Sequence, residues 1–272
     1  AGAVFGIYNK EDIKADGKVI VKADEQLCTA VTGEDGTAIF EQNLPFGSYY
    51  IKELQAPDGF VSSDEIIEVT VSYQGQDVEV VRLKEIFKNQ PTTVEFRKSD
   101  LTTGVELDGA TLTVLDKDGN EIDKWTSVKG EPHIIKRLHV GETYILREEF
   151  APYGYLKAEE VEFTITDTAE IQKVEMKDDV PIGRIIINKK GEFLSEVSWN
   201  DMVAGAMDSI WGYVTGSLKD VTFEIYARED IKAADGESDD YYKKDELVAT
   251  IKTDELGIAR TDDLPLGKYY VV

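Results

Sequence analysis

The stretch YILREEFAPYGY at Tyr144–Tyr155 occurs a second time in the chain, as YYIKELQAPDGF at Tyr49–Phe60. Both copies have a tyrosine, a glutamate four residues later, and the ending A-P-x-G followed by an aromatic residue. Tyrosine, isoleucine and leucine favour a strand, and the proline and glycine that follow favour a turn. A match of this detail within one chain predicts a repeated structural unit.

Further matches on either side of this motif indicate that the unit occurs three times. IYNKEDIKADG at Ile7–Gly17 corresponds to IYAREDIKAADG at Ile225–Gly236, and LPFGSYY at Leu44–Tyr50 corresponds to LPLGKYY at Leu264–Tyr270. Each copy opens with an alternating apolar segment, as a half-buried strand does: Gly2–Tyr8, Gly109–Leu115 and Asp220–Tyr226. Turn signals recur between such segments and helical periodicity is nearly absent, so we predict an all-β fold of tandem sandwiches or small barrels.

Two prolines mark the predicted domain boundaries, because each ends one strand and precedes a new alternating segment: Pro91 and Pro181. We name the resulting domains repeat one (residues 1–90), repeat two (91–181) and repeat three (182–272). We expect repeat one to lack its first strand, repeat two to be complete, and repeat three to carry an insertion at about 192–219 and to be truncated at its C-terminus. Neither linker is long or rich in Gly and Ser, so little bending is expected between repeats.

The composition argues against several classes of function. Acidic residues outnumber basic ones 54 to 30, giving the 272-residue chain a formal charge of -24, so nucleic acids and anionic membrane surfaces would be repelled. Cys28 is the single cysteine, which excludes an internal disulfide and a cysteine-based metal site. Asp116–Asn120 is typical of a hairpin turn rather than a calcium loop. We expect no metal, no cofactor and no membrane span in this sequence.

Three polar residues of repeat two are predicted to share the apolar face of its strands. Lys98 lies in VEFRKSD, Glu148 in YILREE and Asp178 in VEMKDD, each two residues after an apolar residue. Because side chains alternate along a strand, this spacing directs all three toward the core. The alternative is that they are partly exposed strand residues, and a register shift of one residue would select Asp179 instead of Asp178.

An amine and two carboxyl groups buried together would have the environment needed to form an amide. Burial disfavours charged groups, so an uncharged amine can attack a protonated side-chain carboxyl while a second carboxyl transfers protons. The product would be a covalent crosslink between the first and last strands. We expect only this single-turnover reaction and no enzyme, since no hydrolase, metalloprotease or phosphate-binding motif is present.

The repeats resemble the CnaB-type, SpaA-like prealbumin-fold domains of Gram-positive surface adhesins and pilins over essentially the whole chain, and the glutamate motif resembles the pilin E-box. The resemblance implies tandem Ig-like, prealbumin-like β-sandwich domains and an autocatalytic isopeptide bond from Lys to Asn or Asp, assisted by the glutamate. The residues that it implies for this chemistry are Lys98, Glu148 and Asp178 in repeat two, Glu53 and Asn89 in repeat one, and Lys189 in repeat three. The lysine of repeat one would precede residue 1, so we expect only the middle bond to form within these 272 residues.

The insertion of repeat three is the candidate surface for a ligand. Trp and Tyr dominate binding hot spots, and the insertion contains three such residues: Trp199, Trp211 and Tyr213. The alternative is that these side chains cover the sandwich or the junction with the neighbouring repeat.

These observations lead us to expect a structural stalk or adhesin segment of a cell-wall-anchored protein on the surface of a Gram-positive bacterium. Attachment to the cell wall by a sortase would use regions outside this sequence. The alternative function is binding of a host extracellular-matrix protein such as collagen, or of a glycan, through the aromatic insertion. A small-molecule carrier is compatible with the fold alone, which does not define a function.

Overall fold

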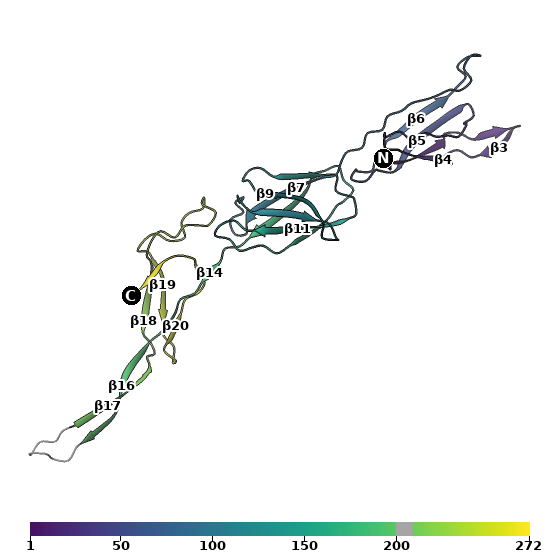
Figure 1. The fold of residues 1–272 in the computed structure, drawn as a ribbon. Helices are drawn as coiled ribbons and strands as arrows, with labels where there is room; N and C mark the ends of the chain where they lie inside the picture. Colours follow the sequence, from purple (N-terminus) through teal and green to yellow (C-terminus); the bar gives the residue numbers. More distant parts are fainter. Residues whose placement is uncertain (200–208) are drawn as a thin grey trace, which may run out of the picture. The chain divides into compact units, whose positions relative to one another are not determined.

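The computed structural model describes residues 1–199 and 209–272 of the chain. The regular secondary structure in these residues is entirely β, which confirms the predicted fold class (Figure 1). Among the same residues there is no helix with the length and apolarity needed to cross a bilayer. They divide into two compact units: unit one comprises Ala1–Lys98, Asp108–Phe150 and Ala158–Met176, and unit two comprises Ser99–Leu107, Ala151–Lys157 and Lys177–Val272.

Repeat one, which belongs to unit one, is built around a single four-stranded sheet. Its strands are β1 (Val4–Asn9), β2 (Ile13–Ala15), β3 (Lys18–Val21), β4 (Gln26–Val31), β5 (Gly47–Gln55) and β6 (Ile66–Val71). The antiparallel sheet has the order β4-β1-β5-β6, and β2 and β3 form a separate hairpin. One face of the sheet buries Ile7, Tyr49 and Val69, against which the half-buried Cys28 also packs.

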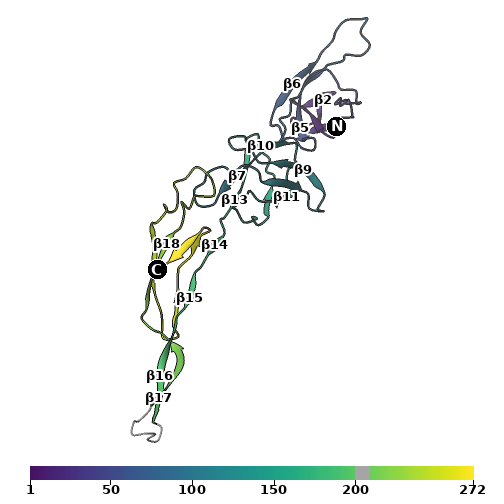
Figure 2. The ribbon, with the colours of Figure 1, turned by 60° about the vertical axis from the view of Figure 1, so that its left-hand side comes forward.

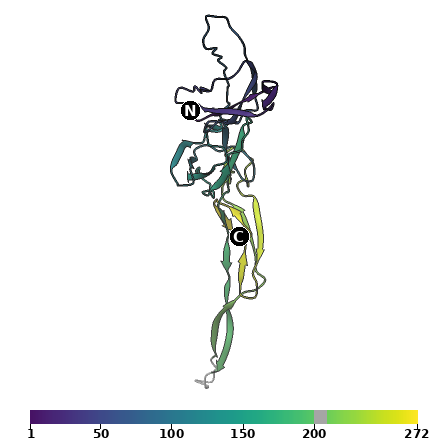
Figure 3. The same ribbon diagram turned by 90° about the vertical axis from the view of Figure 1, so that its right-hand side faces the viewer.

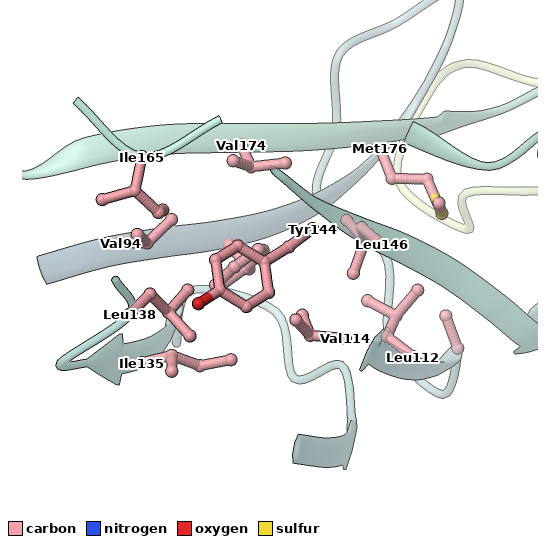
Figure 4. Packing of buried hydrophobic residues seen from close by; sticks show 12 residues of the cluster. Val94, Leu112, Val114, Ile135, Leu138, Tyr144, Leu146, Ile165, Val174 and Met176 are labelled. Carbon is pink, nitrogen blue, oxygen red and sulfur yellow. The ribbon is translucent and has the colours of Figure 1, made fainter. Parts of the chain in front are cut away.

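Repeat two is a sandwich of two sheets. Its strands are β7 (Thr93–Asp100), β8 (Thr111–Leu115), β9 (Glu121–Thr126), β10 (His133–Lys136), β11 (Thr143–Phe150), β12 (Val161–Thr164) and β13 (Gln172–Asp178). One sheet has the order β10-β7-β13 and the other the order β12-β11-β8-β9. Apolar side chains from both sheets meet in the core, among them Val94, Val114, Leu146 and Val174 (Figure 4). This close packing of alternating residues from two sheets supplies the main hydrophobic stabilisation of the repeat.

Repeat three, in unit two, is assembled from short strands and a long ribbon. Its strands are β14 (Ile182–Gly183), β15 (Ile186–Asn188), β16 (Lys190–Trp199), β17 (Ser209–Ser217), β18 (Thr222–Ala227), β19 (Leu247–Lys252), β20 (Ile258–Arg260), β21 (Leu264–Pro265) and β22 (Tyr269–Val271). A three-stranded sheet has the order β19-β18-β22, while β14 pairs with β21 and β15 with β20. The insertion forms the antiparallel ribbon β16-β17 (Figure 2, Figure 3).

The Leu-Pro turns of repeats one and three are closed by the tyrosine that follows them. The hydroxyl of Tyr49 donates to the carbonyl of Pro45 at 2.7 Å, and the hydroxyl of Tyr269 donates to that of Pro265 at 2.7 Å. Because Tyr49 is anchored and buried, strand β5 leaves the turn in a fixed register. That register determines the face on which Glu53, four residues later, is presented.

Candidate crosslinking site

Lys98 and Glu148 form a buried ion pair in the core of repeat two. Lys98 lies on β7 and Glu148 on β11, which belong to different sheets of the sandwich. The Lys98 Nζ lies 3.0 Å from the Glu148 Oε1, and neither side chain has any solvent exposure. Charged residues are rarely fully buried unless they are paired, so the two sheets bring an amine and a carboxylate together away from water.

Alternation along the two strands explains why these groups are buried. Phe96 and Lys98 occupy successive inward positions of β7, and Leu146 and Glu148 do so on β11. The second oxygen of Glu148, Oε2, accepts the backbone N–H of Ala158 at 2.7 Å. This hydrogen bond holds the carboxylate through the oxygen that does not contact the lysine.

Asp178 is the last residue of β13, and β13 neighbours β7 in the same sheet. Its side chain is buried, whereas Asp179 is exposed. The backbone carbonyl of Asp178 accepts the N–H of Leu101, just beyond the end of β7, at 2.8 Å. Asp178 is therefore the carboxyl that points into the protein at this end of the sheet.

Repeat one brings Glu53 and Asn89 together. The Nδ2 of Asn89 donates to both carboxylate oxygens of Glu53, at 2.9 and 2.8 Å, and to the carbonyl of Val61 at 3.3 Å. Glu53 also accepts the backbone N–H of Ser63 at 3.1 Å. Both side chains are half-buried, so this pair is more accessible than the one in repeat two.

Asn89 does not lie on a strand, whereas Asp178, its counterpart in repeat two, is the last residue of β13. In repeat two the corresponding segment, β13, pairs with β7. Residues 1–90 contain no strand that corresponds to β7, so the backbone before Asn89 has no neighbour with which to complete a hydrogen-bond ladder. A strand without a partner leaves its backbone groups unpaired and is not stable by itself.

The hydrogen bonds around the two glutamates correspond residue by residue. Each glutamate accepts a backbone N–H from the residue ten positions later: Ser63 for Glu53 and Ala158 for Glu148. The residue directly after each motif donates its backbone N–H to the carbonyl of the residue that follows the candidate Asn or Asp. These hydrogen bonds run from Val61 to Gln90 at 2.9 Å and from Leu156 to Asp179 at 2.8 Å. This register aligns Asn89 with Asp178 rather than with Asp179.

Lys189, the candidate of repeat three, has an exposed side chain in the single residue between β15 and β16. Its backbone N–H donates to the carbonyl of Gly257 at 2.8 Å, and its carbonyl accepts the N–H of Leu218 at 3.1 Å. The structure thus places this lysine at the surface, where the chain passes from the body of repeat three into the ribbon.

The aromatic residues of the insertion lie on the ribbon. Trp211 and Tyr213 are 54% and 61% exposed. They share one face of the ribbon with Leu194, which pairs with Tyr213, and with Val197, which pairs with Trp211. The side chain of Trp199 lies outside the described residues. The two described aromatic side chains therefore face solvent and do not cover a sandwich.

One residue next to the site, Asp100, is not among those predicted from the sequence. Asp100 lies two positions after Lys98 on β7 and is also buried, and its Oδ2 accepts the hydroxyl of Tyr155 at 2.7 Å. Hydrogen bonds from Thr102 and Thr103 satisfy the other oxygen. Asp100 continues the alternation of Phe96 and Lys98, and this was the signal that could have identified it.

The chain belongs to the family described as SpaA, prealbumin-like fold domain, which matches residues 1–85, 92–180 and 213–272. The structure is similar to that of the Bacillus anthracis TIE protein, with 26% identity and a TM-score of 0.53 over 99% of this chain, which spans 41% of that protein. It is also similar to a streptococcal ancillary pilin (24% identity, TM-score 0.29, 66% of this chain and 57% of the pilin) and to the shaft pilin SpaA of Lactobacillus rhamnosus GG (17%, 0.31, 66% and 85%). No curated protein matches the sequence.

Proposed function

We propose that this chain is a load-bearing segment of a surface protein of a Gram-positive bacterium, and that repeat two is locked by an amide bond between Lys98 and Asp178. The observation that carries the proposal is the fully buried contact of 3.0 Å between Lys98 and Glu148. The buried Asp178 on the strand next to β7 adds the acyl group that such a bond requires. Membership of the SpaA prealbumin-like family supports the cell-surface location.

The reaction would be a condensation within the chain. The uncharged Nζ of Lys98 attacks Cγ of the protonated Asp178, and a tetrahedral intermediate forms. Glu148 takes a proton from the attacking nitrogen and passes it to the departing hydroxyl, which leaves as water while the C–N bond is kept. One amide and one water are the products, and Glu148 is regenerated.

Burial of the three groups favours this reaction. Two charges in a dry core cost several kcal/mol each in desolvation, which their mutual attraction only partly offsets. Conversion of an amine and an acid into a neutral amide removes that cost. The fixed positions of the side chains also replace a bimolecular encounter by an intramolecular one. The proposed reaction turns over once and needs no cofactor.

The test is the intact mass of the purified chain under denaturing conditions. We expect the parent to be lighter than its sequence by one water, and the Glu148→Ala variant to have the full mass. Glu149→Ala is the matched control, because Glu149 is the adjacent residue on the opposite face of β11. Digestion should recover a branched peptide that joins Lys98 to Asp178 in the parent and in Glu149→Ala.

The two candidate carboxyls can be separated in the same measurement. Asp178→Ala should restore the full mass, while Asp179→Ala should retain the loss of one water. Full mass in the parent itself would overturn the crosslink and leave a buried ion pair as the function of Lys98 and Glu148.

A second candidate function is ligand binding by the ribbon, and the exposure of Trp211 and Tyr213 favours it. An exposed aromatic face with neighbouring aliphatic residues is typical of an interaction site. Collagen and glycans are the candidate ligands, and a Trp211→Ala, Tyr213→Ala double variant should lose saturable binding in surface plasmon resonance. Tyr153→Ala, which removes a fully exposed tyrosine of repeat two, is the control that should bind like the parent.

A further inference from the structure

The end of the glutamate motif forms the same turn in repeats one and two. In each copy the aromatic N–H donates to the proline carbonyl three residues earlier: Phe60 to Pro57 at 3.0 Å and Tyr155 to Pro152 at 3.1 Å. The glycine between them has a positive φ, +78° at Gly59 and +92° at Gly154. This conformation favours glycine, since other residues are strained there. We call these two segments, Ala56–Phe60 and Ala151–Tyr155, the motif turns.

The motif turn of repeat one packs against repeat two. A Cβ atom on Gly59 would lie 2.6 Å from the carbonyl oxygen of Arg137 and 2.9 Å from its Cα. The Arg137 guanidinium lies over the ring of Phe60, 4.8 Å from the ring centroid. A cation over an aromatic face is attracted to it. The absence of a side chain on Gly59 is therefore what permits this close approach of two backbones.

Hydrogen bonds fasten the same contact. Thr92, which is fully buried, donates its N–H to the carbonyl of Gly59 at 3.1 Å and its hydroxyl to the carbonyl of Leu138 at 2.6 Å. The N–H of Ser62 donates to the carboxylate of Asp167 at 2.9 Å. Thr92 thus connects the motif turn of repeat one to the loop of repeat two through both its backbone and its side chain.

The motif turn of repeat two likewise lies against repeat three, at the segment between β18 and β19. A Cβ on Gly154 would lie 3.4 Å from the Cβ of Ala234. Tyr155 donates its hydroxyl to Asp100 at 2.7 Å, and Thr103, in the loop that follows Asp100, donates its hydroxyl to Asp235 at 3.1 Å. Two side-chain hydrogen bonds therefore lead from the motif turn through the Asp100 loop to repeat three.

The ionisation states suit this chain of hydrogen bonds. Burial and the neighbouring Asp100 raise the pKa of Tyr155, so the phenol keeps its proton and donates it. Burial acts to raise the pKa of Asp100, but hydrogen bonds from Thr103, Tyr155 and Thr102 outweigh it, and the pKa lies below its usual value. A protonated phenol facing an ionised carboxylate makes a strong, charge-assisted hydrogen bond.

We propose that the motif turns are docking surfaces whose partner is the next repeat of the same chain, and that they restrict bending between consecutive repeats. The motif then has two roles in two of its parts: its glutamate belongs to the crosslinking site, and its A-P-x-G-aromatic ending belongs to the junction. The junction contacts are formed without the Lys98–Asp178 bond, so this proposal stands or falls separately from the crosslink.

The experiment measures the distance distribution between spin labels on repeats one and two by pulsed electron spin resonance. Labels are attached at Glu34→Cys and Glu121→Cys, two exposed positions, in a Cys28→Ala background of the full 272-residue chain. We expect a narrow distribution in this parent. Gly59→Ala should widen it about twofold, because relative motion is the default for domains without a fixed interface.

Gly119→Ala is the matched control. Gly119 also has a positive φ, +83°, but a Cβ there would meet no atom within 4 Å, so it imposes the same kind of backbone strain without a clash between repeats. It should leave the distribution as narrow as in the parent. Asp167→Ala removes only the exposed acceptor of the Ser62 N–H, and it should widen the distribution even if Gly59→Ala folds poorly.

The second junction is tested in the same way, with labels at Glu121→Cys and Thr250→Cys. Tyr155→Phe removes the hydroxyl that bonds Asp100 and should widen the distribution, while Tyr153→Phe removes a fully exposed hydroxyl and should not. Distributions in Gly59→Ala, Asp167→Ala and Tyr155→Phe as narrow as in the parent would overturn the proposal. The intact mass of each variant, read in parallel, reports the crosslink independently.

Discussion

We predict that mechanical unfolding of the chain releases less contour length than its number of residues allows. Changing Glu148 to Gln should restore the missing length. If Lys98 and Asp178 are joined, the residues between them cannot be extended by a force applied to the two ends of the chain. That closed loop contains about 80 residues, and an extended chain spans at most ~3.3–3.6 Å per residue. The Glu148→Gln variant should therefore release roughly 260–290 Å more contour length than the parent when repeat two unfolds.

Single-molecule pulling between handles at residues 1 and 272 measures this length directly. The Glu148→Gln side chain keeps the size of the native one and removes the group proposed to carry the proton, so the bond does not form. Glu149→Gln changes the next residue, on the other face of β11, and should give the same extension as the parent. The control separates the loss of one acidic group in general from the loss of the proton carrier.

Two outcomes would refute the reasoning. If the parent and Glu148→Gln release equal lengths, and both include the section from Lys98 to Asp178, no covalent loop exists in the parent. If both lack that length, the bond forms without Glu148, and the assignment of the proton carrier is wrong although the crosslink is not.

Three further predictions follow from the same contacts. Closing a loop of about 80 residues stabilises a fold by about 4–5 kcal/mol through chain entropy, so Glu148→Gln should weaken the hydrogen-exchange protection of β7 by at least that free energy. Asp178→Asn should still react, with loss of ammonia instead of water, and its crosslinked product should have the same mass as the crosslinked parent. Burial would raise the pKa of Asp235, but hydrogen bonds from Ser238 and its neighbours lower it to about 2. Because this folded-state pKa is depressed from 3.8, its stabilisation is present above about pH 4 and is lost toward pH 2, and exchange protection of the Ser238 amide should fall over that interval.

Local alternation was sufficient to predict the fold class and the inward positions of repeat two. Lys98, Glu148 and Asp178 each follow a buried apolar residue by two positions, and all three are buried in the structure. A period of two in the sequence translates directly into a face of a strand, because each residue reverses the side-chain direction.

Other features depend on partners that alternation does not specify. Asn89 follows a segment that reads as a strand, yet the segment forms none, since a strand also requires a neighbour with free backbone groups. The approach of Gly59 to Arg137 joins loops of two repeats, and neither loop has a periodic pattern. The ribbon was anticipated only as an insertion, although β17 is nine residues long and has Trp211 and Tyr213 at alternate positions.

The proposed crosslink and the proposed junctions lie on one path of force through repeat two. Force from repeat one enters β7 at its first residues, and force toward repeat three leaves just after Asp178. The hydrogen bond from the Leu101 N–H to the Asp178 carbonyl shows that the end of β13 lies beside the end of β7. Force applied at the start of β7 and at the end of β13 therefore pulls the two strands along each other and loads their hydrogen bonds together. An amide between Lys98 and Asp178 would transmit the force directly from β7 to β13, so most of the repeat would not be strained. Thr92, bonded to Gly59, precedes the start of this path, and Asp179, bonded to Leu156, follows its end. Under the two proposals, the motif turns would hold the chain directly outside the section that the Lys98–Asp178 bond would protect.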